Sequence, residues 1–248
     1  MIPYNEYGKR EKPTILLLHG AAVLDTFYGQ YSFSEHYHLV VPHLHGAGKS
    51  ADRVYDPEAL KHEIFEVIDS LNKDKIGVIG YSLGAQLAIM LVCERPEQFS
   101  FAVFLSAWVN PKPKIVRMYC SLAGIIVKIL HCKWFVRLQA KYWNFTKEQA
   151  DYMAEYSQLI TPQVYKSFFM NTLDLQKLPK YMTLNVPMLA ICGSKEVKDM
   201  KISLHMLGRN PHCQTIMLPK ANHNYPMRNT KQLNKILEKF ILEWSGMF

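Results

Sequence analysis

The chain of 248 residues predicts an α/β fold, with a mostly parallel, doubly wound sheet and an inserted block of helices. Short apolar runs recur along the chain, and stretches with helical periodicity separate them. Continuous apolar runs of this length are typical of strands that are buried on both faces, as in a parallel sheet. The six runs cover residues 14–18, 38–41, 76–79, 101–105, 187–192 and 215–218.

Helical patterns lie between these runs. Apolar residues at spacings of three and four indicate helices that bury one face. One helix is predicted around residues 60–71, a second around 83–91 and a last one around 233–241. The alternation of strands and helices predicts right-handed crossover connections, which build a doubly wound sheet.

Residues 110–180 break the alternation, because no strand pattern occurs there. Helical patterns are predicted around 115–129, 134–143, 146–158 and 162–173. Thr146 and Gln149 have the spacing of a capping box, and Thr161-Pro162 is a typical helix start. We interpret 110–180 as a helical lid inserted into a core of residues 1–109 and 181–248. A separate helical domain is the alternative, but the segment begins and ends between two strands of one sheet.

The net charge of the chain is +8. Residues 111–180 hold 11 Lys or Arg and 4 Asp or Glu, so nearly all of the excess lies in the predicted lid. A solvated basic face, attraction to an anionic membrane surface or acyl-phosphate substrate, and nucleic-acid binding are the three interpretations. Nucleic-acid binding is the least favoured, since no element that reads nucleic acid is evident.

The five cysteines are odd in number, lack CxxC spacing and lie mostly in apolar runs. This usage favours a reduced, cytoplasmic setting. The N-terminus does not have the pattern of a signal peptide. No uncharged apolar run reaches the ~18 residues of a membrane-spanning helix.

Ser82 stands in Gly80-Tyr81-Ser82-Leu83-Gly84, directly after the run at 76–79. Two glycines permit a tight, strained turn that holds a serine out of the sheet. The N–H of the following residue then points at a developing oxyanion. A serine hydroxyl is a poor nucleophile by itself, so this chemistry also needs a base.

Three further pieces follow predicted strands. His19-Gly20-Ala21-Ala22 follows the run at 14–18, and a loop of small residues can offer a backbone N–H to a substrate carbonyl. Gly193-Ser194-Lys195-Glu196 follows the run at 187–192 and carries a carboxylate. His223 follows the last run and precedes the final helix. The order along the chain is serine, acid, histidine.

These motifs make the chain resemble the α/β-hydrolase superfamily over nearly its whole length, specifically single-domain, lid-bearing members with a serine nucleophile. The resemblance implies that Ser82 is the nucleophile and His223 its general base. Glu196 would orient the imidazole, and the N–H groups of Ala21 and Leu83 would form the oxyanion hole. The resemblance implies no metal and no organic cofactor.

The acid is the least secure member of this set. The family usually has aspartate where Glu196 stands, and Asp199 lies three residues further on, in a predicted helix. The segment 106–110, after the run at 101–105, is the family's other common position for the acid and contains no carboxylate. Glu196 is therefore favoured, with Asp199 as the alternative.

Several other residues suggest sites that their surroundings do not support. Gly48-Lys49-Ser50 ends like a phosphate-binding loop, but that motif requires glycine where His43 stands. His43 and His45 lack a third metal ligand, and the loop that carries them is mainly structural in the family, where His43 replaces the usual aspartate. His19 is expected to pack behind the oxyanion loop. The predicted lid has five notable aromatic residues: Trp134, Trp143, Tyr152, Phe168 and Phe169. A minority of them is expected to line an apolar pocket, while most pack the lid onto the sheet.

The sequence thus predicts hydrolysis of a carboxylic ester or related acyl compound through an acyl-enzyme. The apolar lid favours a small or medium apolar substrate. Cleavage of a carbon–carbon bond and a lyase reaction are alternatives on the same scaffold. A small-ligand receptor with this fold is a further alternative. Haloalkane dehalogenation is disfavoured, because it needs a carboxylate nucleophile where Ser82 stands.

Overall fold

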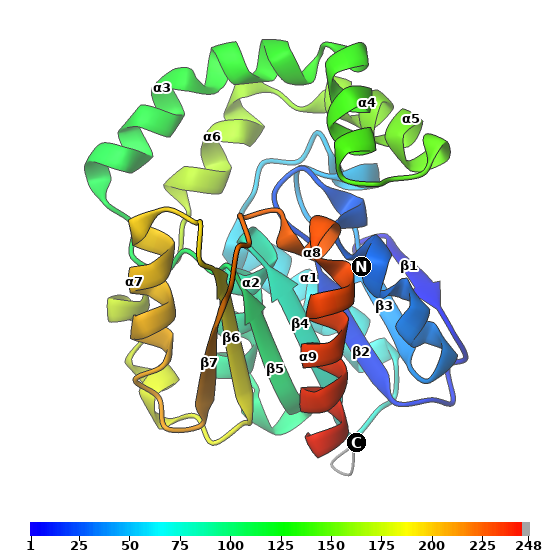
Figure 1. Cartoon of the computed structure of the whole chain (residues 1–248), viewed down its shortest axis with the longest axis vertical. Coiled ribbons are helices and arrows are strands. Elements are labelled where there is room, and N and C mark those ends of the chain that lie inside the picture. The colour runs from blue at the N-terminus through cyan, green and yellow to red at the C-terminus, as the bar shows by residue number, and fades with distance from the viewer. Residues whose placement is uncertain (245–248) are drawn as a thin grey trace.

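The computed structural model describes residues 1–244 and shows a seven-stranded sheet with helices on both faces (Figure 1). Helix α9 lies in front of the sheet, and α1 and α2 lie behind it. The order across the sheet is β1-β3-β2-β4-β5-β6-β7. The strands are β1 (Tyr4–Tyr7), β2 (Thr14–Leu18), β3 (His38–Pro42), β4 (Ile76–Tyr81), β5 (Phe99–Leu105), β6 (Met188–Gly193) and β7 (Cys213–Leu218).

The six predicted runs form β2 to β7, and neighbouring strands among them pair in parallel. β2 to β6 are buried along their whole length, which explains why their sequences are mostly apolar. β1 was not predicted. It is an antiparallel edge strand beside β3, and its four residues are only half-buried, so it carries no apolar run.

Nine α-helices are found in the described residues. They are α1 (Pro57–Ser70), α2 (Leu83–Glu94), α3 (Pro113–Leu130), α4 (Lys133–Tyr142), α5 (Lys147–Tyr156), α6 (Pro162–Met170), α7 (Lys198–Leu207), α8 (Tyr225–Arg228) and α9 (Thr230–Trp244). The predicted capping box of Thr146 and Gln149 is confirmed at α5, and Thr161 caps α6 ahead of Pro162. α6 is shorter than predicted: it ends at Met170, where Asn171 leaves the helical conformation and its side chain donates to the Tyr55 carbonyl at 2.7 Å.

Helices α3 to α6 follow β5 and precede β6, and they arch across one end of the sheet (Figure 1). We call residues 110–180 the insert. Tyr156 ties it to the core: its hydroxyl accepts from Leu24 N–H at 3.2 Å and donates to the Ala22 carbonyl at 3.1 Å. Ser167 adds a second tie by accepting from Tyr55 N–H at 2.9 Å. These bonds hold the insert over the carboxyl ends of the parallel strands.

No single helix within residues 1–244 is long and apolar enough to cross a membrane. α3 and α4 reach that length and apolarity only together, and they are bent by 93° at the break between them. Cys93, Cys192 and Cys213 are buried, as their apolar surroundings predict, whereas Cys120 and Cys132 lie partly exposed on the insert. All five are free thiols.

Candidate active site

Ser82 occupies the turn between β4 and α2 with a strained backbone, at φ +53° and ψ −112°. The turn is tight on both sides. A Cβ at Gly80 would collide with the carbonyl of Gly84, and one at Gly84 would collide with that of Leu18. The Ser82 N–H donates to the Leu105 carbonyl at 2.8 Å. Only glycines at these two positions allow the backbone segments to approach so closely. The tight turn that they form holds the Ser82 side chain at the end of the sheet.

His223 and Glu196 come together from two neighbouring strand ends. His223 Nδ1 lies 2.6 Å from Glu196 Oε2. The Glu196 side chain is 1% exposed, whereas that of His223 is 46% exposed. Tyr81 holds the histidine from below, since its hydroxyl donates to the His223 carbonyl at 2.9 Å and the two rings lie 5.1 Å apart. The imidazole is therefore anchored at Nδ1 and through its backbone, and it remains accessible.

The carboxylate of Glu196 accepts two more hydrogen bonds at its other oxygen. Gly193 N–H donates to Oε1 at 2.6 Å, and Ser106 Oγ donates to the same atom at 2.7 Å. Burial by itself raises the pKa of Glu196, but His223, Gly193 and Ser106 outweigh it and hold the pKa below its ordinary value. The group is thus an anion at neutral pH, as a partner for an imidazolium must be.

Asp199, the alternative acid, lies in the first turn of α7, as predicted. Its carboxylate pairs with Lys112 at the start of the insert. It borders the same cavity as Ser82, but it is Glu196 that bonds to the imidazole. This geometry favours Glu196 over Asp199.

Ala21 and Leu83, the predicted oxyanion donors, border the same cavity as Ser82. Within residues 1–244, neither backbone N–H has a hydrogen-bond partner. The residue after Ala21 is held in the left-handed region, with φ +59° at Ala22. Two unpaired donors beside a serine suit a developing oxyanion, whereas buried N–H groups are otherwise almost always paired.

His19 and His43 support the loops behind these donors. His19 Nδ1–H donates to the Gly20 carbonyl at 2.8 Å, and Nε2 accepts from Leu44 N–H at 3.0 Å. His43 Nδ1 accepts from Lys49 N–H at 2.9 Å. Each ring must stay neutral, because a proton on the accepting nitrogen would face an N–H. Burial accordingly lowers the pKa of both His19 and His43 to about 4.

These two histidines predict a loss of stability in mild acid. Between pH 6.5, the ordinary pKa of histidine, and about pH 4, its pKa in the folded chain, these histidines are protonated in the unfolded chain and neutral in the folded chain. The free energy of unfolding should therefore fall as pH drops through this window, by about 2–3 kcal/mol for each histidine. Urea unfolding at a series of pH values measures the slope.

His43→Gln removes one titrating group and should flatten that slope, whatever its effect on stability at neutral pH. Gln232→Asn, at an exposed position of α9 without a titratable side chain, is the control and should leave the slope unchanged. An equal slope in the parent chain and in His43→Gln would contradict the assignment.

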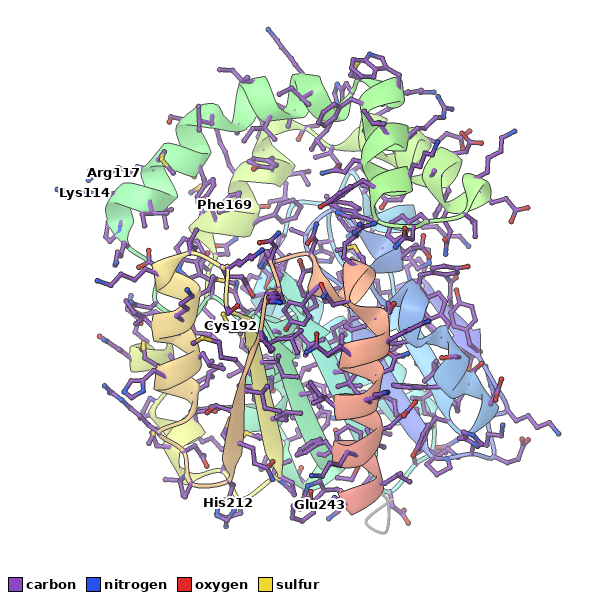
Figure 2. All side chains as sticks on the ribbon, in the orientation of Figure 1. Lys114, Arg117, Phe169, Cys192, His212 and Glu243 are labelled. Carbon is purple, nitrogen blue, oxygen red and sulfur yellow. The ribbon has the colours of Figure 1, made fainter. Side chains whose placement is uncertain are left out.

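A cavity of about 640 Å³ lies between Ser82 and the insert. Its walls are mostly apolar. Phe168 and Phe169 belong to the wall, and Figure 2 shows Phe169 on α6 below the arch of α3. The lining residues are Ala21, Ser82, Leu83, Gln86, Trp108, Ile115, Met118, Tyr119, Phe168, Phe169, Thr172, Lys195, Glu196, Val197, Asp199, Met200 and His223.

An adjoining hollow of about 480 Å³ also touches Ser82 and His223, and Trp143 lines it. Three of the five lid aromatics, Phe168, Phe169 and Trp143, line these two cavities, which is more than the predicted minority. Trp134 is exposed instead, and Tyr152 packs against Tyr156.

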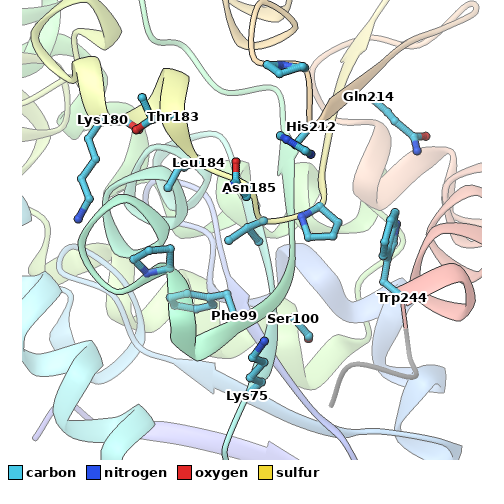
Figure 3. A pocket seen from close by; sticks show the side chains of 14 residues that line it. Lys75, Phe99, Ser100, Lys180, Thr183, Leu184, Asn185, His212, Gln214 and Trp244 are labelled. Carbon is cyan, nitrogen blue, oxygen red and sulfur yellow. The ribbon is translucent and has the colours of Figure 1, made fainter.

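A third depression, of about 660 Å³, lies at the other end of the sheet (Figure 3). Lys75, Leu184, His212 and Trp244 are among its lining residues. None of the predicted catalytic residues borders it, so the cavity beneath the insert is the candidate active site.

Sequence reasoning missed two residues of this site, Ser106 and Tyr81. Ser106 directly follows β5 and has φ +50°, a conformation that aims its hydroxyl at Glu196. Its place after a strand end was a usable signal, because that is the family's other position for the acid. Tyr81 gave no signal, since a tyrosine inside a strand is ordinary core.

Comparisons with known proteins identify the family and the fold of the chain. The model of the family described as "Alpha/beta hydrolase family" matches residues 15–236. A Stutzerimonas stutzeri protein with the provisional name carbamate hydrolase RutD is 22% identical, over 98% of this chain and 97% of its own.

Two solved structures share the fold. A carboxylesterase structure of the thaumarchaeon Nitrososphaera gargenis superposes with a TM-score of 0.75 at 14% identity, covering 99% of this chain and 96% of the other. MenH from S. aureus gives 0.73 at 16% identity, covering 99% and 100%. Since the family model spans most of its length, the chain belongs to the alpha/beta hydrolase family and is a hydrolase of that family.

Proposed function

We propose that the chain is a serine hydrolase that cleaves a carboxylic ester or related acyl compound through an acyl-enzyme. One observation carries the proposal: the buried Glu196 carboxylate bonds to His223 Nδ1 at 2.6 Å, beside the strained Ser82 that shares their cavity. A nucleophile, a base and an orienting acid on three strand ends are what activation of a serine requires.

In the proposed reaction, His223 Nε2 takes the Ser82 hydroxyl proton as Oγ attacks the substrate carbonyl carbon. The N–H groups of Ala21 and Leu83 stabilise the resulting oxyanion, and Glu196 stabilises the imidazolium. Collapse of this tetrahedral intermediate breaks the bond between the acyl carbon and the leaving group, and the leaving group receives the proton from His223 Nε2. Water, deprotonated by the same imidazole, then attacks the acyl carbon and restores Ser82.

The insert of residues 110–180 acts in this proposal as a lid on a core of residues 1–109 and 181–248. Ile115, Tyr119 and Phe169 give the cavity an apolar wall opposite Ser82, and the rings of Tyr119 and Phe169 stack at 4.3 Å. Such a wall suits a small or medium apolar acyl or alcohol group rather than a sugar or peptide. Five free thiols support a cytoplasmic setting.

A carbamate is a second candidate, because the relative with the name carbamate hydrolase RutD aligns over nearly the whole of both chains. It needs no other machinery. A carbamate carbonyl is attacked in the same way, and the two substrates differ only in the group that remains on Ser82.

Turnover and labelling together test the proposal. p-Nitrophenyl esters of increasing acyl length and a p-nitrophenyl carbamate should release nitrophenol with an initial burst, strongest for the acyl group that fits the cavity. A fluorophosphonate should label Ser82, identified by mass spectrometry of the peptide. Labelling without turnover of any ester or carbamate would favour carbon–carbon cleavage, a lyase or a receptor. No labelling would overturn the role of Ser82.

A further inference from the structure

The insert carries an exposed apolar surface on its first two helices. Of the 17 large hydrophobic side chains that are exposed within residues 1–244, eight lie between residues 118 and 142. We call these eight the apolar stripe: Met118, Leu122, Ile125 and Ile129 on α3, and Trp134, Phe135, Leu138 and Tyr142 on α4.

The spacing of the stripe follows the helices. Its members on α3 recur at intervals of four, three and four residues, so they share one flank. On α4, Trp134, Leu138 and Tyr142 are four residues apart, and the first two are 67% and 58% exposed. A contiguous apolar surface of this kind is typical of an interaction site, whereas single exposed hydrophobic residues need no explanation.

Basic side chains accompany the stripe on both helices. Figure 2 shows Lys114 and Arg117 pointing away from the body of the protein at the start of α3. No Asp or Glu occurs between residues 98 and 147. The cations on the two helices are Lys114, Arg117, Lys128, Lys133, Arg137 and Lys141. Among them, only Arg137 has an ion pair within residues 1–244, with Asp151.

The stripe also reaches both cavities of the candidate active site. Met118 belongs to the wall of the cavity that contains Ser82, and Tyr142 lines the adjoining hollow that contains His223. A partner that covers the stripe would therefore lie at the entrance to both cavities.

We propose that the apolar stripe and its cations bind the surface of an anionic lipid bilayer, with α3 and α4 lying at the interface. Aliphatic and aromatic side chains of such helices enter the boundary between head groups and acyl chains, while Lys and Arg meet the anionic head groups. Trp and Tyr favour this boundary. The 93° bend between α3 and α4 suits helices that lie on a membrane and not a straight span across it.

Charge favours a bilayer over a second copy of the chain. In a symmetric dimer the same surface meets itself, which would bring the five cations that lack an ion pair within residues 1–244 against the same five of the other copy. An anionic lipid surface instead supplies the missing negative charge.

When the protein is bound in this way, the entrance to the two cavities opens toward lipid. The expected substrate class is then an amphiphile with an apolar acyl chain. This consequence rests on the proposed function, but binding to the bilayer does not. Ser82→Ala should bind vesicles as the parent chain does, so a failure of catalysis and a failure of docking are distinguishable.

Vesicle flotation tests the docking. The full chain should float with phosphatidylcholine vesicles that contain phosphatidylserine, less with phosphatidylcholine alone, and less at high salt. The triple variant Lys128→Gln, Lys133→Gln, Lys141→Gln should weaken binding roughly fivefold per cation. Lys231→Gln, Lys235→Gln, Lys239→Gln is the matched control on exposed positions of α9 and should bind as the parent does.

The apolar part has its own test. Trp134→Ser with Leu138→Ser should weaken binding about tenfold or more, while Met217→Ser with Leu242→Ser, at other exposed positions, should not. Lipids brominated in their acyl chains should quench tryptophan fluorescence, and Trp134→Phe should remove that quenching.

Two results would overturn the proposal. One is binding that is absent, or equal on both kinds of vesicle. The other is a dimer in sedimentation equilibrium that Trp134→Ser with Leu138→Ser dissociates, because the stripe would then contact a second copy. Retained hydrolysis of a short, water-soluble ester shows that the lysine variants and the apolar-stripe variants are folded.

Discussion

Ser82→Ala should lower kcat for a p-nitrophenyl ester by about 10⁴- to 10⁶-fold, with KM little changed. The hydroxyl oxygen forms the bond to the acyl group, so its loss removes the first chemical step and the burst with it. Ala21, Leu83 and the cavity walls remain and still bind the substrate. A small residual rate above that in water is expected from these groups alone. Stopped-flow and steady-state kinetics measure both the burst and kcat.

The strained turn permits a sharper control. Ser82→Gly removes the same hydroxyl and also relieves the backbone, which stands at φ +53°. Glycine adopts this conformation without steric cost, so the free energy of unfolding should rise by about 1 kcal/mol relative to Ser82→Ala. Both variants should be equally inactive. Ser70→Ala, at an exposed serine of α1, should retain parent activity. Parent-like turnover in Ser82→Ala would refute the role of this residue as nucleophile.

The parallel sheet could be predicted from sequence because burial on both faces leaves a direct trace. β4 and β5 carry no exposed residue, so their sequences are almost wholly apolar, with the buried Ser100 as the polar exception in β5. β1 leaves no such trace. Its four half-buried residues gain their strand geometry from pairing with β3, at an edge where one face meets solvent. Strands stabilised mainly by tertiary pairing escape prediction from local pattern.

The site residues likewise fall into those that the local sequence predicts and those that it does not. Ser82 and His223 stand in local contexts, a glycine-flanked turn and a strand end, that the sequence displays. Ser106 acts through space, 90 positions away from the carboxylate to which it donates. Residue spacing carries no information about that contact. The choice between Glu196 and Asp199 likewise depended on which side chain faces the imidazole. Glu196 stands in the turn before α7 and bonds to His223, whereas Asp199 stands in the first turn of α7 and pairs with Lys112.

The insert shows most clearly what helical periodicity can and cannot predict. Its helices and caps follow from periodicity and from the Thr146 and Thr161 signals. From periodicity alone, an apolar helix flank is predicted to pack against the core. Periodicity therefore cannot separate aromatic residues that line the cavity from those that are exposed. Phe169 lines the cavity and Trp134 is exposed, although both lie in amphipathic helices. Only the three-dimensional arrangement separates them.

Glu196→Gln should lower kcat by about 10³- to 10⁴-fold while the chain stays folded. The amide can present its NH₂ group to His223 Nδ1, which places the ring proton on Nε2. That nitrogen can then no longer accept the proton of Ser82. The amide also provides no negative charge for the imidazolium that forms in the transition state. Steady-state kinetics measures the fall in kcat, and circular dichroism checks the fold.

Two further substitutions separate the acid from its surroundings. Asp199→Asn breaks an ion pair with Lys112 and should leave kcat close to that of the parent, since this carboxylate does not bond to the imidazole. Ser106→Ala should fall between the two, at about tenfold, because it removes one charge-assisted hydrogen bond worth ~1.5 kcal/mol and leaves the carboxylate in place.

The order of these effects distinguishes a catalytic carboxylate from a merely buried one. If Glu196 only stabilised the loop after β6, Glu196→Gln would change kcat little, because the amide oxygen can still accept from Gly193 and Ser106. If Asp199 were the acid, Asp199→Asn would show the large loss in kcat. A large fall in kcat in Glu196→Gln, a smaller one in Ser106→Ala and none in Asp199→Asn would require that the negative charge at Glu196 acts on His223.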